Sequence, residues 1–308
     1  MKAKTLSSSL LLLLAALIWG STFVAQSVGM EHIGPLTFVC VRSFIGSAAL
    51  IPVLAVMQKT SIRQGNTEGI LPRTKRERGR AILGGTVCGV FLMFGMVLQQ
   101  YGMLHLNMTG GNVGKAGFIT TMYILLVPIF GLFFRQKVSP KLWVSVGLAI
   151  IALYLLSVSE GFSIAVGDIS LILCAFAFAA QILAADYFVK ETSGVLLSCI
   201  QFLFCALVTL IPAIFMESPE VTSILGAWQS ILYAGIMSSG VAFTLQIVAQ
   251  KDLHPTLASL LMSCESVFAV LSGFLILGQA PTSRELIGSV IMFIAVILAQ
   301  LPPLKKKK

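Results

Sequence analysis

The sequence predicts an all-α, polytopic membrane protein with ten transmembrane helices arranged as two inverted five-helix repeats. Composition is the first observation: hydrophobic residues make up 57% of the 308 residues and charged residues only 11%, against roughly 25% charged in soluble domains. So few charged side chains exclude a soluble enzyme and a disordered chain. Nearly every backbone polar group must then be satisfied inside helices. Apolar run length and an internal repeat are the other two observations.

A hydrocarbon core about 30 Å thick needs about 20 mostly apolar residues per helix. Ten runs come near this length, in chain order 8–28, 36–57, 81–103, 113–134, 142–158, 164–185, 194–214, 225–249, 255–277 and 286–301. The first run follows Lys2 and Lys4 and has some features of a secretory signal. Because further spans follow at once, we interpret it as an uncleaved helix.

The basic residues orient these spans. With both termini in the cytoplasm, every Lys and Arg lies in a cytoplasmic segment except Arg42, Lys115 and Arg284, as the cytoplasmic bias of basic residues requires. The sequence therefore predicts a multi-pass protein of the cell (cytoplasmic or inner) membrane with both termini inside. The net charge of +9 is then a topology signal, and we expect no nucleic-acid partner. The basic loop 73–80 and the tail Lys305–Lys308 suit anionic lipid.

The two halves of the chain resemble each other. Residues 1–158 contain helices one to five, and residues 159–308 contain helices six to ten with the basic cytoplasmic tail. Leu36–Pro52 aligns with Leu196–Pro212, and both segments end in Leu-Ile-Pro. Because five is an odd number, the second repeat must cross the membrane in the opposite sense, which is typical of secondary transporters.

Glu265 lies near the middle of the ninth span. An ionised side chain there costs roughly 2.5–3.5 kcal/mol on insertion scales. Intramembrane acids commonly mark substrate or proton sites, so Glu265 is a candidate for substrate binding and proton coupling. The alternative is a structural acid that is hydrogen-bonded across a helix contact.

A glycine-rich segment opens the fourth span and contains Gly114, Lys115 and Gly117. Free N–H groups at a helix start, together with the Lys115 charge, could bind a carboxylate or phosphate. Close helix packing, with Lys115 reaching the outer interface, is the alternative. Pro128, later in this span, is expected to kink it.

Arg42 lies inside the second span, where reaching the outer interface or pairing is the favoured interpretation. Other polar and aromatic residues could form the walls of a cavity: Trp19, Gln99, Gln100, Tyr101, Tyr123, Gln181 and Gln246. The six cysteines all lie in apolar runs without metal-ligand spacing, and they suit small buried hydrophobes. We therefore predict no metal, no cofactor and no catalytic residues.

The segment Thr109–Gly131, with its core Gly114-Lys115-Ala116-Gly117-Phe118-Ile119-Thr120, resembles the signature of EamA-type transporters of the drug/metabolite transporter superfamily. The resemblance covers essentially the whole chain, including Ile18–Val24, Pro35–Phe44 and Ala258–Val267. It implies two inverted EamA repeats and secondary transport, often efflux of amino acids, other metabolites or drugs. Ser266 departs from the pattern, where proline is frequent.

We therefore predict a secondary transporter, not an enzyme, that moves a small metabolite by alternating access, with efflux of an amino acid or related compound favoured. Protons are a candidate coupling ion, and the oligomeric state is undetermined. One alternative is a sugar-phosphate or nucleotide-sugar exchanger, which would need more cavity cations than Arg42 and Lys115 supply. An intramembrane enzyme or a non-transporting scaffold is a further alternative, although no HExxH, GxSxG or P-loop motif occurs.

Overall fold

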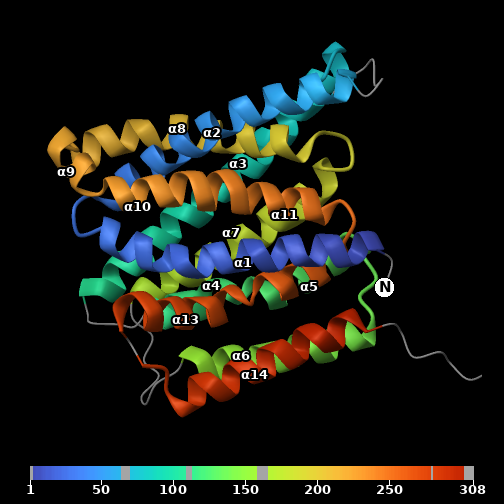
Figure 1. The fold of residues 1–308 in the computed structure, drawn as a ribbon, viewed down its shortest axis with the longest axis vertical. Helices are drawn as coiled ribbons and strands as arrows, with labels where there is room; N and C mark the ends of the chain where they lie inside the picture. The colour runs from blue at the N-terminus through green and yellow to red at the C-terminus, as the bar shows by residue number, and fades with distance from the viewer. Residues whose placement is uncertain (1–2, 64–69, 109–112, 158–165, 279, 302–308) are drawn as a thin grey trace, which may run out of the picture.

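The computed structural model describes residues 3–63, 70–108, 113–157, 166–278 and 280–301. Within these ranges all regular elements are helical, and the chain runs back and forth through a bundle (Figure 1). In chain order the elements are α1 (Ala3–Gly29), α2 (Pro35–Arg63), α3 (Lys75–Met108), α4 (Val113–Thr121), α5 (Tyr123–Phe133), α6 (Pro140–Ser157), α7 (Val166–Phe188), α8 (Gly194–Pro212), the π-helical η1 (Ala213–Glu217), α9 (Val221–Gly226), α10 (Trp228–Tyr233), the π-helical η2 (Ala234–Ala242), α11 (Phe243–Gln250), α12 (Pro255–Met262), α13 (Glu265–Leu277) and α14 (Ser283–Gln300).

The predicted spans are present. In the part of the chain that the structure describes, nine segments are long and apolar enough to cross a membrane, and the apolar helix Pro140–Leu156 is shorter. The fourth span consists of α4 and α5, the seventh of α8 and η1, the eighth of α10, η2 and α11, and the ninth of α12 and α13. The all-α, polytopic fold class is therefore confirmed.

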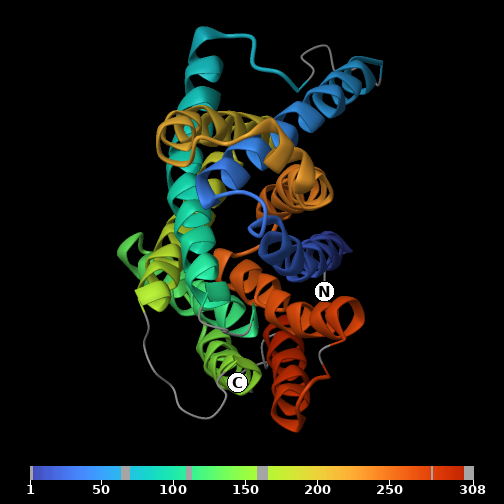
Figure 2. The same ribbon diagram turned by 90° about the vertical axis from the view of Figure 1, so that its left-hand side faces the viewer.

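Helix packing has a two-fold pattern. The second, fourth and fifth spans pack on their counterparts: α2 on α8, α4 and α5 on α13 and α12, and α6 on α14. The packing of α3 on α7 is matched by that of α1 on η2 and α11. Both views show α6 and α14 side by side at one end of the bundle (Figures 1 and 2). Exchanging the repeats leaves this pattern unchanged, and since each repeat crosses five times, counterpart helices run in opposite directions.

Two glycines let α1 approach its neighbours closely. A Cβ atom at Gly20 would lie 2.5 Å from Phe268 Cβ in α13, and one at Gly29 would clash with the Phe38 ring in α2 and lie 3.1 Å from Ser230 Cβ in α10. At Gly20, where backbone atoms of α13 lie 2.7 Å from the added Cβ, only glycine permits this approach. These contacts fix how far α1, α2 and α13 are shifted along one another, and therefore where the charged residues described below lie.

His254 caps the ninth span at the end where α12 begins. Its Nδ1 accepts a hydrogen bond from the Thr256 backbone N–H at 3.2 Å, and Pro255 occupies the first helical turn. Burial lowers the pKa of His254 below its ordinary value, although the nearby Asp186 acts in the opposite direction. The neutral imidazole is therefore the capping form, because only a deprotonated Nδ1 can accept a hydrogen bond.

We expect acidification to weaken this cap. A folded state that lowers the pKa of His254 binds its proton less readily than the unfolded chain does. The stabilisation is therefore complete above the unfolded pKa of about 6.5 and is lost as the pH falls below it. Thermal unfolding in detergent should show a smaller loss of stability on acidification for His254→Asn, which keeps a capping side chain that does not titrate. An equal loss in both proteins would contradict this role.

Candidate functional site

Two of the spans are interrupted near their centres. The fourth span breaks at Met122, between α4 and α5, and the ninth at Ser263 and Cys264, between α12 and α13. A hydroxyl directly before the first break and one within the second donate to a carbonyl of the preceding turn, from Thr121 to Gly117 O and from Ser263 to Leu260 O. Such bonds compete with the helix ladder and often bend helices. The same kind of bond occurs at Thr22 and Ser259 within unbroken helices, so it accompanies the two interruptions but does not by itself cause them.

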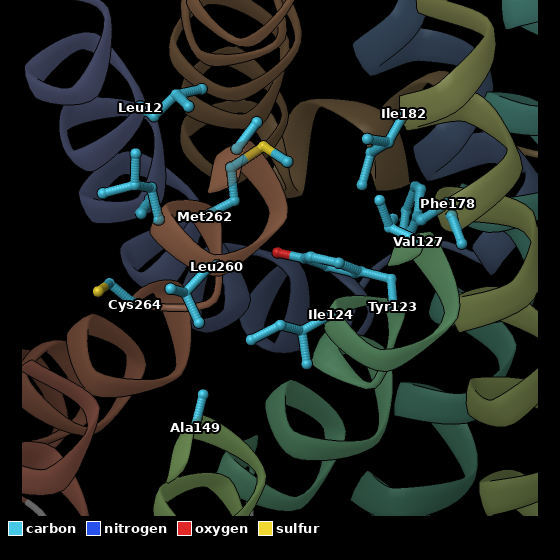
Figure 3. Packing of buried hydrophobic residues seen from close by; sticks show 14 of the residues in the cluster. Leu12, Tyr123, Ile124, Val127, Ala149, Phe178, Ile182, Leu260, Met262 and Cys264 are labelled. Atoms are coloured by element: carbon cyan, nitrogen blue, oxygen red, sulfur yellow. The ribbon is translucent and has the colours of Figure 1, made fainter. Parts of the chain in front are cut away.

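The two breaks face each other across the repeats. Tyr123 is the first residue of α5 and Glu265 is the first residue of α13. The Tyr123 hydroxyl donates to Glu265 Oε1 at 3.0 Å, and Thr121 Oγ1 lies 3.4 Å from the same oxygen. Figure 3 shows the Tyr123 ring pointing from α5 toward Leu260 and Met262 of α12. Glu265 is only 5% exposed and is the first residue of α13, directly after the bend in the ninth span.

Around this pair lies a cavity of about 50 Å³ that both repeats line. This volume is well below the usual range of roughly 300–1,000 Å³ for small-molecule sites, so the cavity in this conformation has room for a few water molecules. Aromatic, amide and aliphatic side chains form most of the wall, and the charged side chains among them are Arg42 and Glu265. The structure brings together here seven residues that the sequence singled out: Trp19, Arg42, Gln99, Tyr123, Gln181, Gln246 and Glu265.

Amides occupy matching places in the two repeats. Gln99 in α3 and Gln246 in α11 each follow a leucine and lie in the third span of their repeat. The Gln99 amide lies 3.5 Å from Thr120 Oγ1, and Gln246 Nε2 donates to Gln181 Oε1 at 3.0 Å. Gln100 and Tyr101, the other predicted wall residues, are not among the residues that line the cavity. The amides that line the cavity therefore include Gln99 and Gln246 from counterpart spans of the two repeats.

Arg42 is buried, contrary to the interpretation that it reaches the outer interface. Its side chain is 3% exposed, and its guanidinium lies over the Phe38 ring at 5.8 Å. Nη2 donates to Ser238 Oγ at 2.8 Å and Nε donates to Ser239 Oγ at 3.2 Å. Both serines belong to η2, which approaches α2 at Gly46, where a Cβ atom would lie 2.6 Å from Ser239 Cβ. Arg42 thus contributes a cation to the cavity wall.

Lys115 lies elsewhere. Its Nζ forms a salt bridge with Asp168 Oδ2 of α7 at 2.7 Å, and it is not among the residues that line the cavity. Gly114 lies in the first turn of α4, and the neighbouring residues 110–112 of the glycine-rich segment lie outside the described residues. Lys115 therefore belongs to an ion pair that joins the two repeats, and it does not lie at the cavity.

The other two predicted structural positions lie beside the broken span. A Cβ atom at Gly117 would be in ordinary contact with Ser266 Oγ and Phe23 at 3.8 and 3.9 Å. Pro128 is buried within α5, which continues through it, so the interruption of the fourth span lies six residues earlier, at Met122. A proline bends a helix mainly in the turn before it, so the expected kink at Pro128 stays a prediction.

Four important polar residues were missed by the sequence reasoning: Gln26, Asp168, Gln201 and Gln250. Gln26 lines the cavity. Gln201 and Gln250 extend the hydrogen-bonded pair of amides Gln181 and Gln246. Gln201 Oε1 accepts from Gln181 at 3.2 Å, and Gln250 Oε1 accepts from Gln246 at 3.2 Å. Each is a polar residue within or at the end of an apolar run, which is a signal in itself. That signal does not distinguish them from other helix-contact amides.

In the part of the chain that the structure describes, no group of three His, Cys, Asp or Glu residues is placed to hold a metal ion. Five of the six cysteines are buried, Cys199 is half-buried, and all six are free thiols. What the arrangement offers chemically is an acid at one place in the cavity wall, a guanidinium at another, and amides and aromatic rings between them.

Comparisons with known proteins agree with this architecture. A sequence model of the EamA-like transporter family matches residues 6–158 and 165–301. An uncharacterized transporter of Archaeoglobus fulgidus is 28% identical over 302 residues, covering 97% of this chain and 87% of the relative. The uncharacterized transporter YoaV of Bacillus subtilis is 21% identical over 287 residues, covering 92% of each chain. A solved crystal structure superposes with a TM-score of 0.73 at 19% identity, covering 96% of both chains, and this likeness concerns the fold alone.

Proposed function

Because the chain belongs to the EamA-like transporter family, we propose that it is a secondary transporter that exports a small metabolite, an amino acid or a related compound, by alternating access. The observation that carries the proposal is the cavity at the two helix interruptions, which both repeats line, with Glu265 in its wall. Transporters commonly bind solutes at such interrupted helices between inverted repeats.

Glu265 is the residue to which we assign the amino group of the solute or a proton. Its carboxylate is buried, and the hydrogen bond from Tyr123 orients it without neutralising its charge. A buried carboxylate is stable only with a cationic partner or a proton. Exchange between the two would couple the movement of the solute to that of protons.

The helix arrangement supports alternating access. Since the packing pattern is unchanged when the repeats are exchanged, two conformations of similar energy, open to opposite sides, are available to such a chain. The distribution of basic residues favours a cell-membrane protein with both termini in the cytoplasm. Among the described lining residues Arg42 supplies the positive charge, which suits a carboxylate better than the several charges of a sugar phosphate.

A vesicle experiment tests this function. A comparison of metabolites in cells with and without the protein would first identify the solutes that accumulate or disappear. The purified chain would then be placed in sealed liposomes loaded with those solutes, and their release would be followed by mass spectrometry. We expect selective release that responds to a pH gradient. Release no faster than from protein-free liposomes would contradict a transport function.

A further inference from the structure

The hydroxyl of Thr121, the last residue of α4, lies between two oxygen atoms that can accept a hydrogen bond. One is the carbonyl oxygen of Gly117 in the preceding turn of α4, and the other is Glu265 Oε1 of α13, at 3.4 Å. Thr121 is fully buried, and a threonine hydroxyl has one hydrogen atom to donate. This hydrogen can therefore be given fully to only one of the two oxygens at a time.

A second hydroxyl, that of Ser266, contacts the same threonine. Ser266 follows Glu265 in α13, is also buried, and places its Oγ 2.9 Å from Thr121 Oγ1. Whichever oxygen takes the Thr121 hydrogen, Thr121 Oγ1 keeps lone pairs that can accept from Ser266. Donation then runs from Ser266 to Thr121 to Glu265, and each hydrogen bond in such a chain strengthens the next. The chain joins the fourth and ninth spans beside their interruptions.

The charge of Glu265 decides which oxygen is the better acceptor for Thr121. An ionised carboxylate forms a stronger hydrogen bond than a neutral carbonyl does, so ionised Glu265 attracts the Thr121 hydrogen. Once Glu265 is protonated or bound to an ammonium group, this advantage is lost and the Gly117 carbonyl takes the hydrogen. Tyr123 donates to the same carboxylate oxygen at 3.0 Å, and one carboxylate oxygen has lone pairs for both donors.

We propose that Thr121 and Ser266 are positioning residues for Glu265, and that the Thr121 hydroxyl transfers its hydrogen bond from Glu265 to Gly117 when Glu265 takes up a proton or the amino group of the solute. This assignment rests on the proposed function for the role of Glu265. A proton and the ammonium group of a free amino acid both fit it. The hydrogen bond in the last turn of α4 then depends on whether Glu265 holds a cation, which links the fourth span to the occupancy of the site.

The other titratable and charged groups around Glu265 do not compete for this role. The titratable side chains that interact with Glu265 are those of Tyr123, Cys174 and Cys264. Their ordinary pKa values, roughly 10 for tyrosine and 8.5 for cysteine, lie far above that of a carboxyl group. Arg42 lines the same cavity, and Lys115 of α4 pairs with Asp168. Glu265 is therefore the carboxyl group that the Thr121 hydroxyl can influence directly.

Infrared difference spectroscopy of the full-length protein in nanodiscs tests this assignment without a solute. A protonated carboxyl group has its own C=O stretching band, and the band that Glu265→Gln removes reports the protonation of Glu265. Loss of a donor to the ionised carboxylate favours the protonated form. In Thr121→Val, which keeps the shape without the hydroxyl, we expect the midpoint of this titration to move to higher pH by about one unit, a tenfold change, as one hydrogen bond to a charged group implies.

Three further variants make the test specific. Thr121→Ser keeps a hydroxyl and should titrate like the wild type, whereas Ser266→Ala removes only the second donor and should move the midpoint upward by a smaller amount. Thr209→Val is the matched control, because Thr209 is also buried and donates to the Cys205 carbonyl of its preceding turn at 2.7 Å, but lies in α8 and is not among the residues that line the cavity. Its midpoint should equal that of the wild type.

An unchanged midpoint in Thr121→Val would overturn the proposal, because the hydroxyl would then serve the Gly117 carbonyl alone. Equal shifts in Thr121→Val and Thr209→Val would also overturn it, since the loss of any buried hydroxyl would explain both. If Thr121→Val fails to fold, Ser266→Ala decides the matter by the same comparison. The liposome experiment is independent of these results. Solute release with an unchanged midpoint would retain the transport function and reject the role of Thr121, and a shifted midpoint without solute release would do the reverse.

Discussion

Replacing Glu265 with glutamine is expected to reduce pH-gradient-driven transport in liposomes by at least tenfold. The amide has nearly the same size and can still accept the hydrogen bond from Tyr123, but it neither ionises nor carries a proton at physiological pH. If Glu265 exchanges a proton for the amino group of the solute, this change removes the coupling while leaving the cavity intact. The measurement is solute accumulation against its gradient at two external pH values.

Two further variants make the Glu265 prediction specific. Tyr123→Phe removes only the hydrogen bond to Glu265, so we expect a smaller loss, at most about tenfold, as one hydrogen bond implies. Glu31→Gln changes an exposed acid in the segment between α1 and α2 and should transport like the wild type. A Glu265→Gln protein that keeps pH-dependent accumulation would refute the assignment of proton or amine binding to Glu265.

Replacing Asp168 with asparagine is expected to destabilise the fold by about 3 kcal/mol, because removing one partner of a buried ion pair leaves the other charge poorly compensated. The Asp168 side chain is 2% exposed and that of Lys115 is 21% exposed. The double variant Lys115→Met, Asp168→Leu replaces the pair by apolar side chains and should recover most of this loss. Equilibrium unfolding in mixed detergent measures the free energies, and the single variants Lys115→Met and Asp168→Leu complete a double-mutant cycle with the double variant.

The exposed pair between Arg80 and Glu191, with side chains 39% and 40% exposed, supplies the comparison. Glu191→Gln should cost no more than about 1 kcal/mol, as is usual at a solvated surface. Transport distinguishes the two interpretations of Lys115. The apolar double variant should retain solute transport if Lys115 is structural. It should lose transport even when correctly folded if Lys115 binds the solute.

Local sequence signals predicted the spans because a bilayer imposes a length and a hydrophobicity on every crossing. The break in the ninth span was not evident from the sequence, since Ser266 replaces the proline that would have marked it. The structure places it at Ser263 and Cys264. Serines form the same hydroxyl bond within unbroken helices, as Ser259 does with Thr256 O, so a serine alone does not mark a break.

The cavity wall was predictable in part. Polar and aromatic residues in apolar runs are few, so selecting them by type found Trp19, Gln99, Tyr123, Gln181 and Gln246. The same rule also selected Gln100 and Tyr101, which are not lining residues, and it did not select Gln26, which is one. Helical periodicity alone does not tell which polar face meets the cavity and which meets a neighbouring helix.

By itself the sequence determined the membrane-spanning fold, the two repeats and the family. These follow from composition, run length and motifs, which are read residue by residue. Only the tertiary structure decided how the rare buried charges are distributed. Lys115 meets Asp168 across 53 positions, Arg42 meets Ser238 across 196, and Tyr123 meets Glu265 across 142. The physical reason is that the energetic cost and the role of a charge inside a membrane depend on the group that pairs with it. For each of these residues the partner comes from a different helix, brought close only by packing.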